Sequence, residues 1–277
     1  MIGEREFRGC VVELVRRAET RSPADIRRAL ERCARSERSK TARLQLRQML
    51  ENLRLAEELG APICQDTGTL SFFVRLGERP DFDIVRSIGM AVAQAEEEIP
   101  LRVNGVDPLS RRPVRGGVWS VHLEPAREGL EVGLLVKGAG TENFSRLFML
   151  SPSEPEEGIC EAVLGVLAEA QGKICPPVVV GIGVGGDPSR TVLMSRLALM
   201  RRLGGRPGRL EALIARRANS LGIGPMGLGG RCTVLGVKVE TAPTHTACLP
   251  VAVSFQCWPG RRGVAKLEDG RMEVVEP

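Results

Sequence analysis

The 277-residue chain has few aromatic residues, no long apolar run and no C-x-x-C pair of cysteines. Aromatic side chains make up 3% of the sequence, so its basic residues lack the interleaved aromatics on which nucleic-acid bases stack. No apolar run approaches the ~20 residues that a transmembrane helix requires. Without a C-x-x-C pair, the chain lacks the usual clip of a structural zinc site. We therefore expect no nucleic-acid partner and no membrane partner.

A secretory signal is also missing, and this decides how the eight cysteines are interpreted. The first residues, Met1–Glu6, lead directly into charged positions instead of an apolar segment. The predicted location is therefore the cytoplasm, where thiols stay reduced. Cys10 and Cys33 fall on apolar faces of predicted helices, and Cys160 and Cys232 lie in apolar segments. We expect these four to be buried, reduced thiols.

The net charge of +5 comes mostly from residues 1–60, which hold 14 Lys and Arg against 10 Asp and Glu. The two signs alternate along this segment, which is typical of solvated helix faces. Apolar spacing and helix-start signals predict helices over 4–19, from 24 onward after Ser22-Pro23, and over 40–59.

After Gly60 the pattern changes to short β-branched runs bounded by Gly or Pro, which predict strands. The expected strands are 69–76, 118–123, 130–137, 178–182, 232–240 and 249–255. Helices are expected at about 82–98, 155–171, 188–203 and 207–220, and residues 260–277 as a short terminal strand or tail.

This order of elements predicts a mixed α/β (α+β) fold, with a helical N-terminal third followed by mixed strands and helices. No low-complexity linker and no internal repeat divides the sequence. We therefore expect residues 1–277 to form one domain, with the helical segment 1–60 packed on it.

Three further cysteines, Cys64, Cys175 and Cys257, each lie at a turn with Gly or Pro beside polar residues. They are too far apart in sequence to form a local clip, so the fold would have to bring them to a shared metal. Three thiolates leave one of four coordination positions vacant, and a vacant position lets a metal act on a substrate. The three cysteines therefore indicate metal-assisted catalysis.

Three polar or glycine-rich segments have both a structural and a functional interpretation. Gln65-Asp66-Thr67-Gly68 is typical of an Asx or type I turn, but beside Cys64 it could also orient a substrate. Lys137–Asn143 (KGAGTEN) is either a β-turn or a nest of N–H groups for an anion. Gly181–Asp187 (GIGVGGD) lacks the third glycine and the later acidic residue of a dinucleotide site, so it indicates nucleotide binding only weakly.

Two histidines and one arginine are also considered as site residues. His245 lies in Thr244–Pro250 (THTACLP), 12 residues before Cys257, where a role in the site competes with a structural one. His122 lies within a predicted strand and is assigned to structure. Arg102, in Pro100–Asn104 (PLRVN), is either a surface group or a bidentate partner for a carboxylate.

These motifs, together with Gly222–Gly230 (GIGPMGLGG), occur in the order found in class I fumarases, and the chain resembles that family from about Leu55 to Arg262. The family comprises iron–sulfur hydro-lyases, including L-tartrate dehydratase. The resemblance implies a [4Fe–4S] cluster on Cys64, Cys175 and Cys257, with Cys248 as a rival third ligand. It assigns catalysis to Asp66 and His245. The substrate-binding residues that it implies are Gln65, Asp66, Arg102, Gly138, Ala139 and Gly140.

Two departures from the family pattern shape the functional expectation. Ala139 stands where the family usually has Gly, and no residue after Cys257 supplies the second domain of single-chain class I fumarases. The resemblance therefore implies an α subunit, inactive alone, that needs a β subunit, as in an α2β2 assembly, to act on a small dicarboxylate. We expect hydration of fumarate to L-malate, with L-tartrate dehydration as the alternative. A non-catalytic iron–sulfur protein or a nucleotide-binding protein is less favoured.

Overall fold

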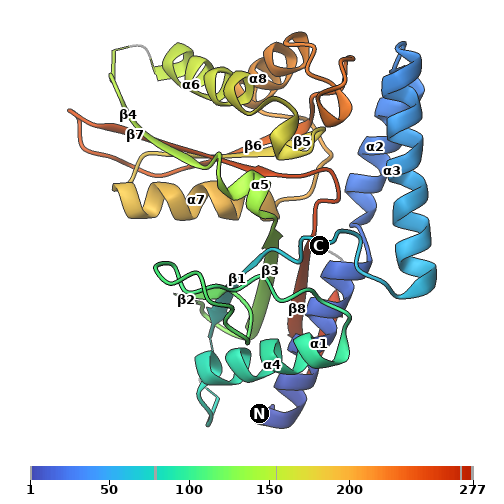
Figure 1. Ribbon diagram of the computed structural model, residues 1–277. Helices are drawn as coiled ribbons and strands as arrows, with labels where there is room; N and C mark the ends of the chain where they lie inside the picture. The colour runs from blue at the N-terminus through green and yellow to red at the C-terminus, as the bar shows by residue number, and fades with distance from the viewer. Residues whose placement is uncertain (1, 78–79, 154, 269, 276–277) are drawn as a thin grey trace. The chain divides into compact units, whose positions relative to one another are not determined.

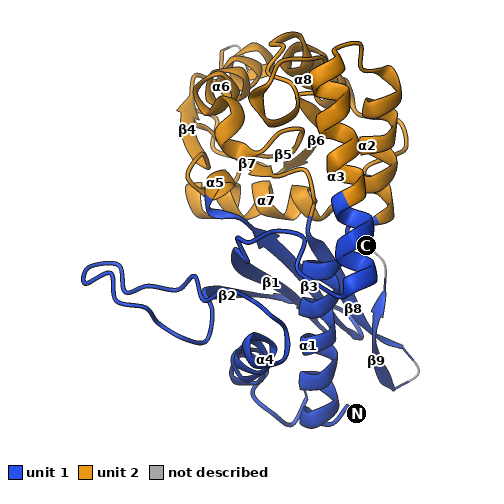
Figure 2. Cartoon of the chain, turned by 45° about the vertical axis from the view of Figure 1, so that its right-hand side comes forward, with its two compact units in different colours: residues 1–23, 52–139, 261–277 blue, residues 24–51, 140–260 orange. Residues whose placement is uncertain are grey.

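Helices and short strands alternate along the computed structural model, which describes residues 2–77, 80–153, 155–268 and 270–275. Contacts divide the chain into two units, each assembled from separate stretches (Figure 2). Unit 1 comprises Met1–Pro23, Asn52–Ala139 and Arg261–Pro277, and unit 2 comprises Ala24–Glu51 and Gly140–Gly260. The predicted mixed α/β class is confirmed. The expectation of one domain with residues 1–60 packed on it stays a prediction.

Unit 1 is built on a five-stranded sheet with the order β2-β1-β3-β8-β9. β1 and β2 are parallel, and the other neighbours are antiparallel. Helix α1 packs against α4, β3, β8 and β9. The elements are α1 (Glu4–Thr20), β1 (Thr69–Leu76), α4 (Ile84–Glu98), β2 (Trp119–Pro125), β3 (Leu130–Lys137), β8 (Arg262–Glu268) and β9 (Arg271–Val275).

The core of unit 1 follows from the spacing of apolar residues in α1 and β1. Phe7, Val11 and Leu14 recur every three or four residues and are buried on one side of α1. They share a core with Phe72 and Val74 of β1. This packing of the N-terminal helix on the sheet that follows Gly60 places the Cys64–Gly68 segment directly before a buried strand.

Unit 2 contains a four-stranded sheet in the order β4-β7-β5-β6. Helices α6 and α8 lie on one face and α7 lies on the other (Figure 1). Every residue of β7 is buried, as expected for a strand covered on both faces. The elements within unit 2 are α2 (Ala24–Ser36), β4 (Arg146–Leu150), α6 (Pro155–Ala170), β5 (Val178–Val184), α7 (Pro188–Met200), α8 (Arg209–Ser220), β6 (Val234–Thr241) and β7 (Leu249–Gln256). Helix α3 (Lys40–Leu59) begins in unit 2 and ends in unit 1. The short helices are α5 (Ala139–Glu142), η1 (Gln171–Ile174) and η2 (Pro225–Gly227).

Most predicted elements are confirmed, and two regions differ from the prediction. The helix at 40–59 and the strands at 69–76 and 130–137 have the predicted bounds. Strand β4 has no predicted counterpart, and the segment expected as a short strand or tail forms the β8–β9 hairpin. Among the described residues, no helix combines the length and apolar character needed to cross a bilayer.

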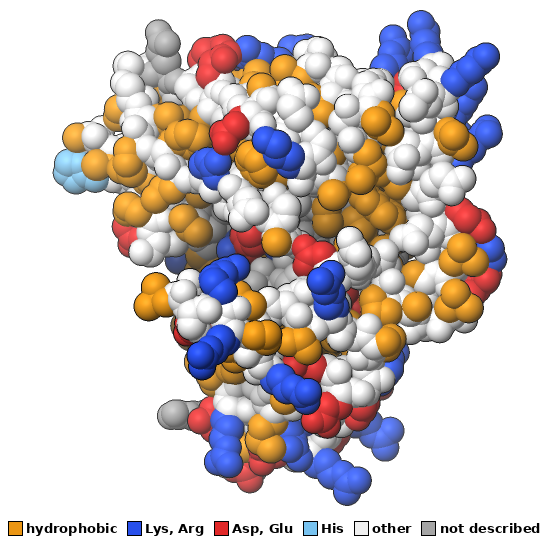
Figure 3. All heavy atoms as spheres, in the orientation of Figure 1, with side chains coloured by type: hydrophobic (Ala, Val, Ile, Leu, Met, Phe, Trp, Pro, Cys, Tyr) orange, Lys and Arg blue, Asp and Glu red, His pale blue; other side chains and the backbone are white. Residues whose placement is uncertain are grey.

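Many charged residues of the N-terminal segment lie on solvated surfaces, as expected, but Glu19, Asp25 and Glu37 are buried. The ends of α2 and α3 that adjoin in sequence carry an exposed basic group, seen at the upper right of Figure 3. Its members are Arg32, Arg35, Arg38 and Lys40.

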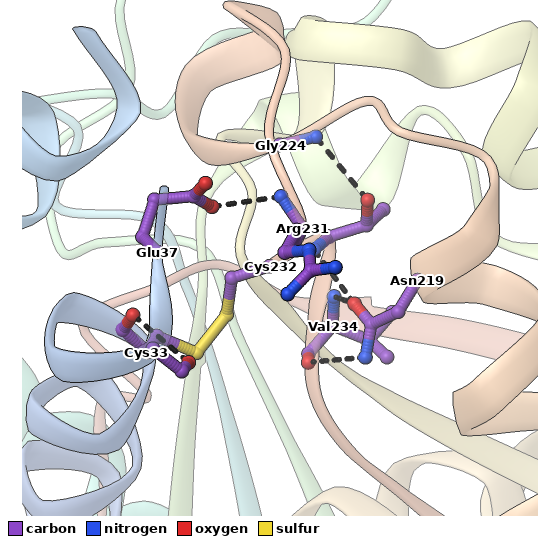
Figure 4. The surroundings of a disulfide bond; sticks show 9 residues. Cys33, Glu37, Asn219, Gly224, Arg231, Cys232 and Val234 are labelled. Carbon is purple, nitrogen blue, oxygen red and sulfur yellow. Dashed lines mark hydrogen bonds between the residues drawn. A yellow bond between two sulfur atoms is a disulfide. The ribbon is translucent and has the colours of Figure 1, made fainter. Parts of the chain in front are cut away.

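The structure corrects the expectation that Cys33 and Cys232 are reduced thiols, because it joins them in a disulfide (Figure 4). Cys33 lies in α2 and Cys232 lies two residues before β6, so the fold brings their Cα atoms to 5.9 Å, within the range that a disulfide spans. Cys10 and Cys160 are free thiols, as expected. Cys160 is fully buried, whereas Cys10 is half-buried, and burial raises the pKa of Cys10 to about 11.

Beside the disulfide, the buried carboxylate of Glu37 accepts hydrogen bonds from three backbone N–H groups, of which Figure 4 shows that from Arg231. The donors are Arg38 at 2.8 Å, Ser39 at 3.0 Å and Arg231 at 2.7 Å. Burial alone would raise the pKa of Glu37, but these hydrogen bonds outweigh it and hold the pKa below its ordinary value of 4.5. The carboxylate thereby fixes the start of α3 to the loop that carries Cys232.

We expect this carboxylate to make stability depend on pH. Well above pH 4.5 Glu37 is ionised in both folded and unfolded chains, so its contribution to stability is complete. As pH falls toward the lowered pKa, the unfolded chain binds the proton first and stability is lost. Denaturant unfolding between pH 3 and 7 should therefore give a shallower loss for Glu37→Gln than for the wild type. The exposed Glu97→Gln should follow the wild type, and equal slopes for all three chains would contradict the assignment.

Candidate functional site

The Cys64–Gly68 segment forms a tight turn at the entrance to β1. The N–H of Gly68 donates to Asp66 Oδ1 at 2.9 Å, which is an Asx turn. Gly68 has a φ of +70°, and a Cβ at this position would lie 2.6 Å from the carbonyl oxygen of Lys137. The turn expected from the sequence is therefore present, and only glycine fits its last position.

The second oxygen of Asp66 joins this turn to the loop after β3. Asp66 Oδ2 accepts from the N–H of Ala139 at 2.7 Å. A Cβ on Gly138 would lie 2.9 Å from the same oxygen, so a larger residue there would displace the carboxylate. The antiparallel register sets this contact, because Thr69 at the start of β1 pairs with Lys137 at the end of β3.

Asn104, which the sequence analysis did not single out, ties a third segment to the same turn. Its amide Nδ2 donates to Asp66 Oδ1 at 3.2 Å and to Thr67 Oγ1 at 2.8 Å. The Thr67 hydroxyl in turn donates to the carbonyl oxygen of Arg102 at 2.7 Å. Asp66, Gly138–Ala139 and the Arg102 backbone are thus brought together in unit 1, while the Arg102 and Gln65 residues remain exposed.

In unit 2, the loops that carry Cys175 and Cys257 lie next to each other. The N–H of Trp258, the residue after Cys257, donates to the carbonyl oxygen of Cys175 at 3.4 Å. The N–H of Met226 donates to the carbonyl oxygen of Pro176 at 2.7 Å. The structure therefore places the Gly222–Gly230 motif beside Cys175, an association that the sequence separation does not reveal.

His245 lies in the exposed loop between β6 and β7. Its Nδ1 accepts from the N–H of Ala247 at 3.2 Å, and its carbonyl oxygen accepts from the N–H of Cys248 at 2.9 Å. From this pattern we assign the proton of the neutral ring to Nε2. His122 stacks on Phe73 with ring centroids 5.4 Å apart, in agreement with the structural role expected for it.

Two glycines of Gly181–Asp187, Gly181 and Gly183, allow close helix packing. A Cβ at Gly181 would collide with the carbonyl oxygen of Ser195, and one at Gly183 would collide with that of Thr191. Both of these oxygens belong to α7, which crosses β5 at this point. The side chain of Asp187 caps α7 by accepting from the N–H of Arg190 at 3.0 Å. This accounts for the motif without a bound nucleotide.

The predicted site residues divide between the two units. Unit 1 holds Cys64, Gln65, Asp66, Arg102, Gly138 and Ala139, and unit 2 holds Gly140, Cys175, His245, Cys248 and Cys257. In the part of the chain that the structure describes, no three His, Cys, Asp or Glu side chains are grouped as metal ligands. The ligand set as a whole therefore stays a prediction.

The three cysteines have the chemistry that an iron–sulfur cluster requires of its ligands. None of the three takes part in the disulfide, Cys257 is buried, and Cys64 and Cys175 are half-buried. Cys64 Sγ accepts a hydrogen bond from the N–H of Asp66, 3.4 Å away. Thiolates with N–H donors to sulfur are typical of cluster ligation, so the residues present fit such a group.

Comparison with known proteins places these features in a family context. The family model described as "Fumarate hydratase (Fumerase)" matches residues 9–266. The chain is 39% identical over 274 aligned positions to the "Putative L(+)-tartrate dehydratase subunit alpha" of Methanocaldococcus jannaschii, with 93% of this chain and 96% of that protein covered.

Two bacterial proteins named "L(+)-tartrate dehydratase subunit alpha" are also similar to this chain. That of Escherichia coli K12 is 34% identical over 257 positions, with 88% of this chain and 85% of that protein covered. That of Escherichia coli UTI89 is 33% identical over 261 positions, with 90% and 86% covered. The chain thus spans most of the length of each of these relatives.

Proposed function

Since the chain belongs to the fumarate hydratase (Fumerase) family of hydro-lyases, we propose that it is the α subunit of an L(+)-tartrate dehydratase. The observation that carries this choice is the match to proteins named as tartrate dehydratase α subunits, at 33–39% identity over nearly the whole chain. The family resemblance inferred from the motifs is confirmed. Hydration of fumarate, which the sequence analysis favoured, becomes the second candidate because these names support tartrate better.

The proposed reaction removes water from a hydroxylated dicarboxylate. One C–O bond and one C–H bond of tartrate break, and the products are water and the enol of a keto dicarboxylate. The chain must therefore hold two carboxylates, assist departure of the hydroxyl group and supply or accept protons. We assign these tasks to the two groups of residues described above.

Cys64, Cys175 and Cys257 are proposed to hold a [4Fe–4S] cluster, whose fourth iron supplies Lewis-acid chemistry to the substrate hydroxyl when the cluster is bound. Asp66, with both oxygens engaged by N–H donors, presents a carboxylate of fixed orientation to the substrate. The N–H of Ala139 is used by Asp66, so the Gly138–Gly140 loop serves first to orient that carboxylate. The exposed Arg102 is proposed to bind a substrate carboxylate.

His245 is the proposed proton carrier of unit 2. Its Nδ1 is engaged by the N–H of Ala247, so Nε2 is the nitrogen available for proton transfer to a substrate oxygen. The remaining groups are proposed to come from a β subunit, in agreement with relatives whose names identify them as α subunits. An α2β2 assembly is the proposed arrangement.

We expect the anaerobically co-expressed α and β chains to contain iron and to turn over L(+)-tartrate. The ratio kcat/KM for L(+)-tartrate should exceed that for L-malate and fumarate by at least about tenfold, since a site built to hydrogen-bond a second hydroxyl rejects substrates that lack it. Each chain purified alone is the control and should be inactive. A preference for malate would establish the fumarase alternative, whereas an iron-free, inactive complex would overturn the hydro-lyase assignment.

A further inference from the structure

Glu19 and Arg261 form a buried ion pair in unit 1 that no motif of the sequence analysis includes. Arg261 Nη1 lies 2.6 Å from Glu19 Oε2, and both side chains are 0% exposed. Glu19 is near the end of α1 and Arg261 directly precedes β8, 242 residues later. Burying two charges is costly, and apolar residues of similar volume often stabilise a protein equally well. Stability alone therefore does not explain why this ion pair is buried.

The backbone of each partner holds a segment that leads into the candidate site. The carbonyl oxygen of Glu19 accepts from the N–H of Ile63 at 2.9 Å, next to Cys64. The carbonyl oxygen of Arg261 accepts from the N–H of Val136 at 3.1 Å, two residues before Gly138. The ion pair thus connects the anchor points of the Cys64–Gly68 turn and of the loop after β3.

Asp66 bridges the same two segments on the side of the site, through its bond from Ala139. A Cβ on Gly138 would lie 2.9 Å from Asp66 Oδ2 and 3.8 Å from Arg261 Nη2, so the guanidinium reaches the point where the two segments meet. Burial raises the pKa of the Glu19 carboxyl, Arg261 opposes that rise, and the charge of Asp66 adds to it. Asp66 is therefore close enough to the pair to act on it electrostatically.

A small cavity extends this connection to the other residues around Asp66. Its volume is about 20 Å³, and Glu19 shares its lining with Thr67, Gly68 and Asn104. All three of these residues belong to the hydrogen-bonded network of the Asp66 turn. Glu19 and the hydrogen-bonded network of the Asp66 turn therefore line one cavity.

We propose that Glu19 and Arg261 are a positioning pair for the substrate site. The pair sets the spacing between the Cys64–Gly68 turn and the Gly138–Ala139 loop, and through that spacing it sets the orientation of the Asp66 carboxylate. This inference rests on the proposed function for its link to turnover, because Asp66 is assigned to the substrate there. Its structural part, the spacing of the two segments, is independent of which substrate is used.

The decisive variant removes both charges and leaves an apolar interior, Glu19→Leu/Arg261→Met. We expect the assembled double variant to fold with the melting temperature and iron content of the wild type, or close to them. Its kcat should fall at least about 100-fold with little change in KM, as expected when a catalytic group is misplaced by about 1 Å. Arg261→Lys, which keeps the positive charge, should recover part of the lost kcat. A double variant with wild-type kcat would overturn the proposal.

Hydrogen–deuterium exchange of the same αβ complexes separates this inference from the proposed function. In the double variant, peptides covering 63–68 and 136–140 should exchange faster, while those covering β5 and α7 should not change. The matched control replaces an exposed pair of the same unit, Arg16 and Glu98, 3.0 Å apart, as Arg16→Met/Glu98→Leu, and should leave exchange and kcat unchanged. Unchanged exchange at 63–68 and 136–140 would overturn the positioning role even if no substrate is turned over.

Discussion

Cys64→Ser, Cys175→Ser and Cys257→Ser are each expected to leave the assembled enzyme without iron-dependent turnover. A cluster held by three protein thiolates loses a third of its protein ligands with each substitution, and serine is a poor ligand for iron–sulfur clusters. Iron and acid-labile sulfide should be measured on anaerobically prepared complexes, together with tartrate turnover. We expect all three quantities to fall together for these three variants.

Two other cysteines complete this experiment, one as a control and one as a test of the rival ligand. Cys160→Ala changes a buried thiol in the core of unit 2 and should retain iron and turnover. Cys248→Ser tests the rival third ligand in the same loop as His245. If Cys248→Ser lost its iron and Cys257→Ser kept it, the ligand assignment would move to Cys248. Loss of iron in both variants would instead favour a non-catalytic cluster with four thiolates.

Opening the Cys33–Cys232 disulfide is expected to destabilise the chain by roughly 2–5 kcal/mol, because the bond constrains a very long loop of the unfolded chain. The two cysteines are 199 residues apart in sequence. Denaturant unfolding of the wild type and of Cys33→Ala/Cys232→Ala, each with and without reductant, measures the effect. Reductant should lower the midpoint of the wild type toward that of the double variant and leave the double variant unchanged.

Thiol titration of the denatured chain provides an independent check. Six of the eight cysteines lie outside the disulfide, so six thiols should react without reductant and eight with it. Cys10→Ala should respond to reductant like the wild type, because Cys10 lies outside the disulfide. Eight reactive thiols in the unreduced wild type, with the same unfolding midpoint with and without reductant, would show that Cys33 and Cys232 are reduced, as the sequence analysis expected.

The sequence predicted the elements that depend on local pattern and missed the contacts that depend on distant residues. The α3 helix and strand β3 were predicted with their bounds because helical periodicity and β-branched runs are local signals. Strand β4 is only five residues long, and its exposed positions are the apolar Leu147 and Met149, so its sequence shows no apolar–polar alternation. The Cys33–Cys232 pair joins residues almost 200 positions apart, and no spacing rule relates them.

The same distinction applies within the candidate site. The Asx turn at Asp66 follows from the sequence, because aspartate bonds the N–H two residues on and Gly68 tolerates a positive φ. The hydrogen bond from the N–H of Ala139 to Asp66 depends on the register of β1 against β3. The sequence of one strand does not show which residues of the neighbouring strand it pairs with. Asn104 was within a quoted motif but gave no signal besides its proximity to Arg102.

The packing of α7 on Gly181 and Gly183 has a consequence for searches that recognise cofactor proteins by their glycine spacing. Such a search compares residue types alone. It cannot distinguish a glycine that allows a phosphate to approach the backbone from one that allows a neighbouring helix to pack closely. The two cases differ in what a methyl group would do. At the glycine that lets a pyrophosphate approach the backbone, an added methyl group obstructs the ligand, whereas at Gly181 or Gly183 it collides with a backbone oxygen of α7. Alanine at either position is therefore expected to disturb the packing of α7 on β5, whether or not a nucleotide is present.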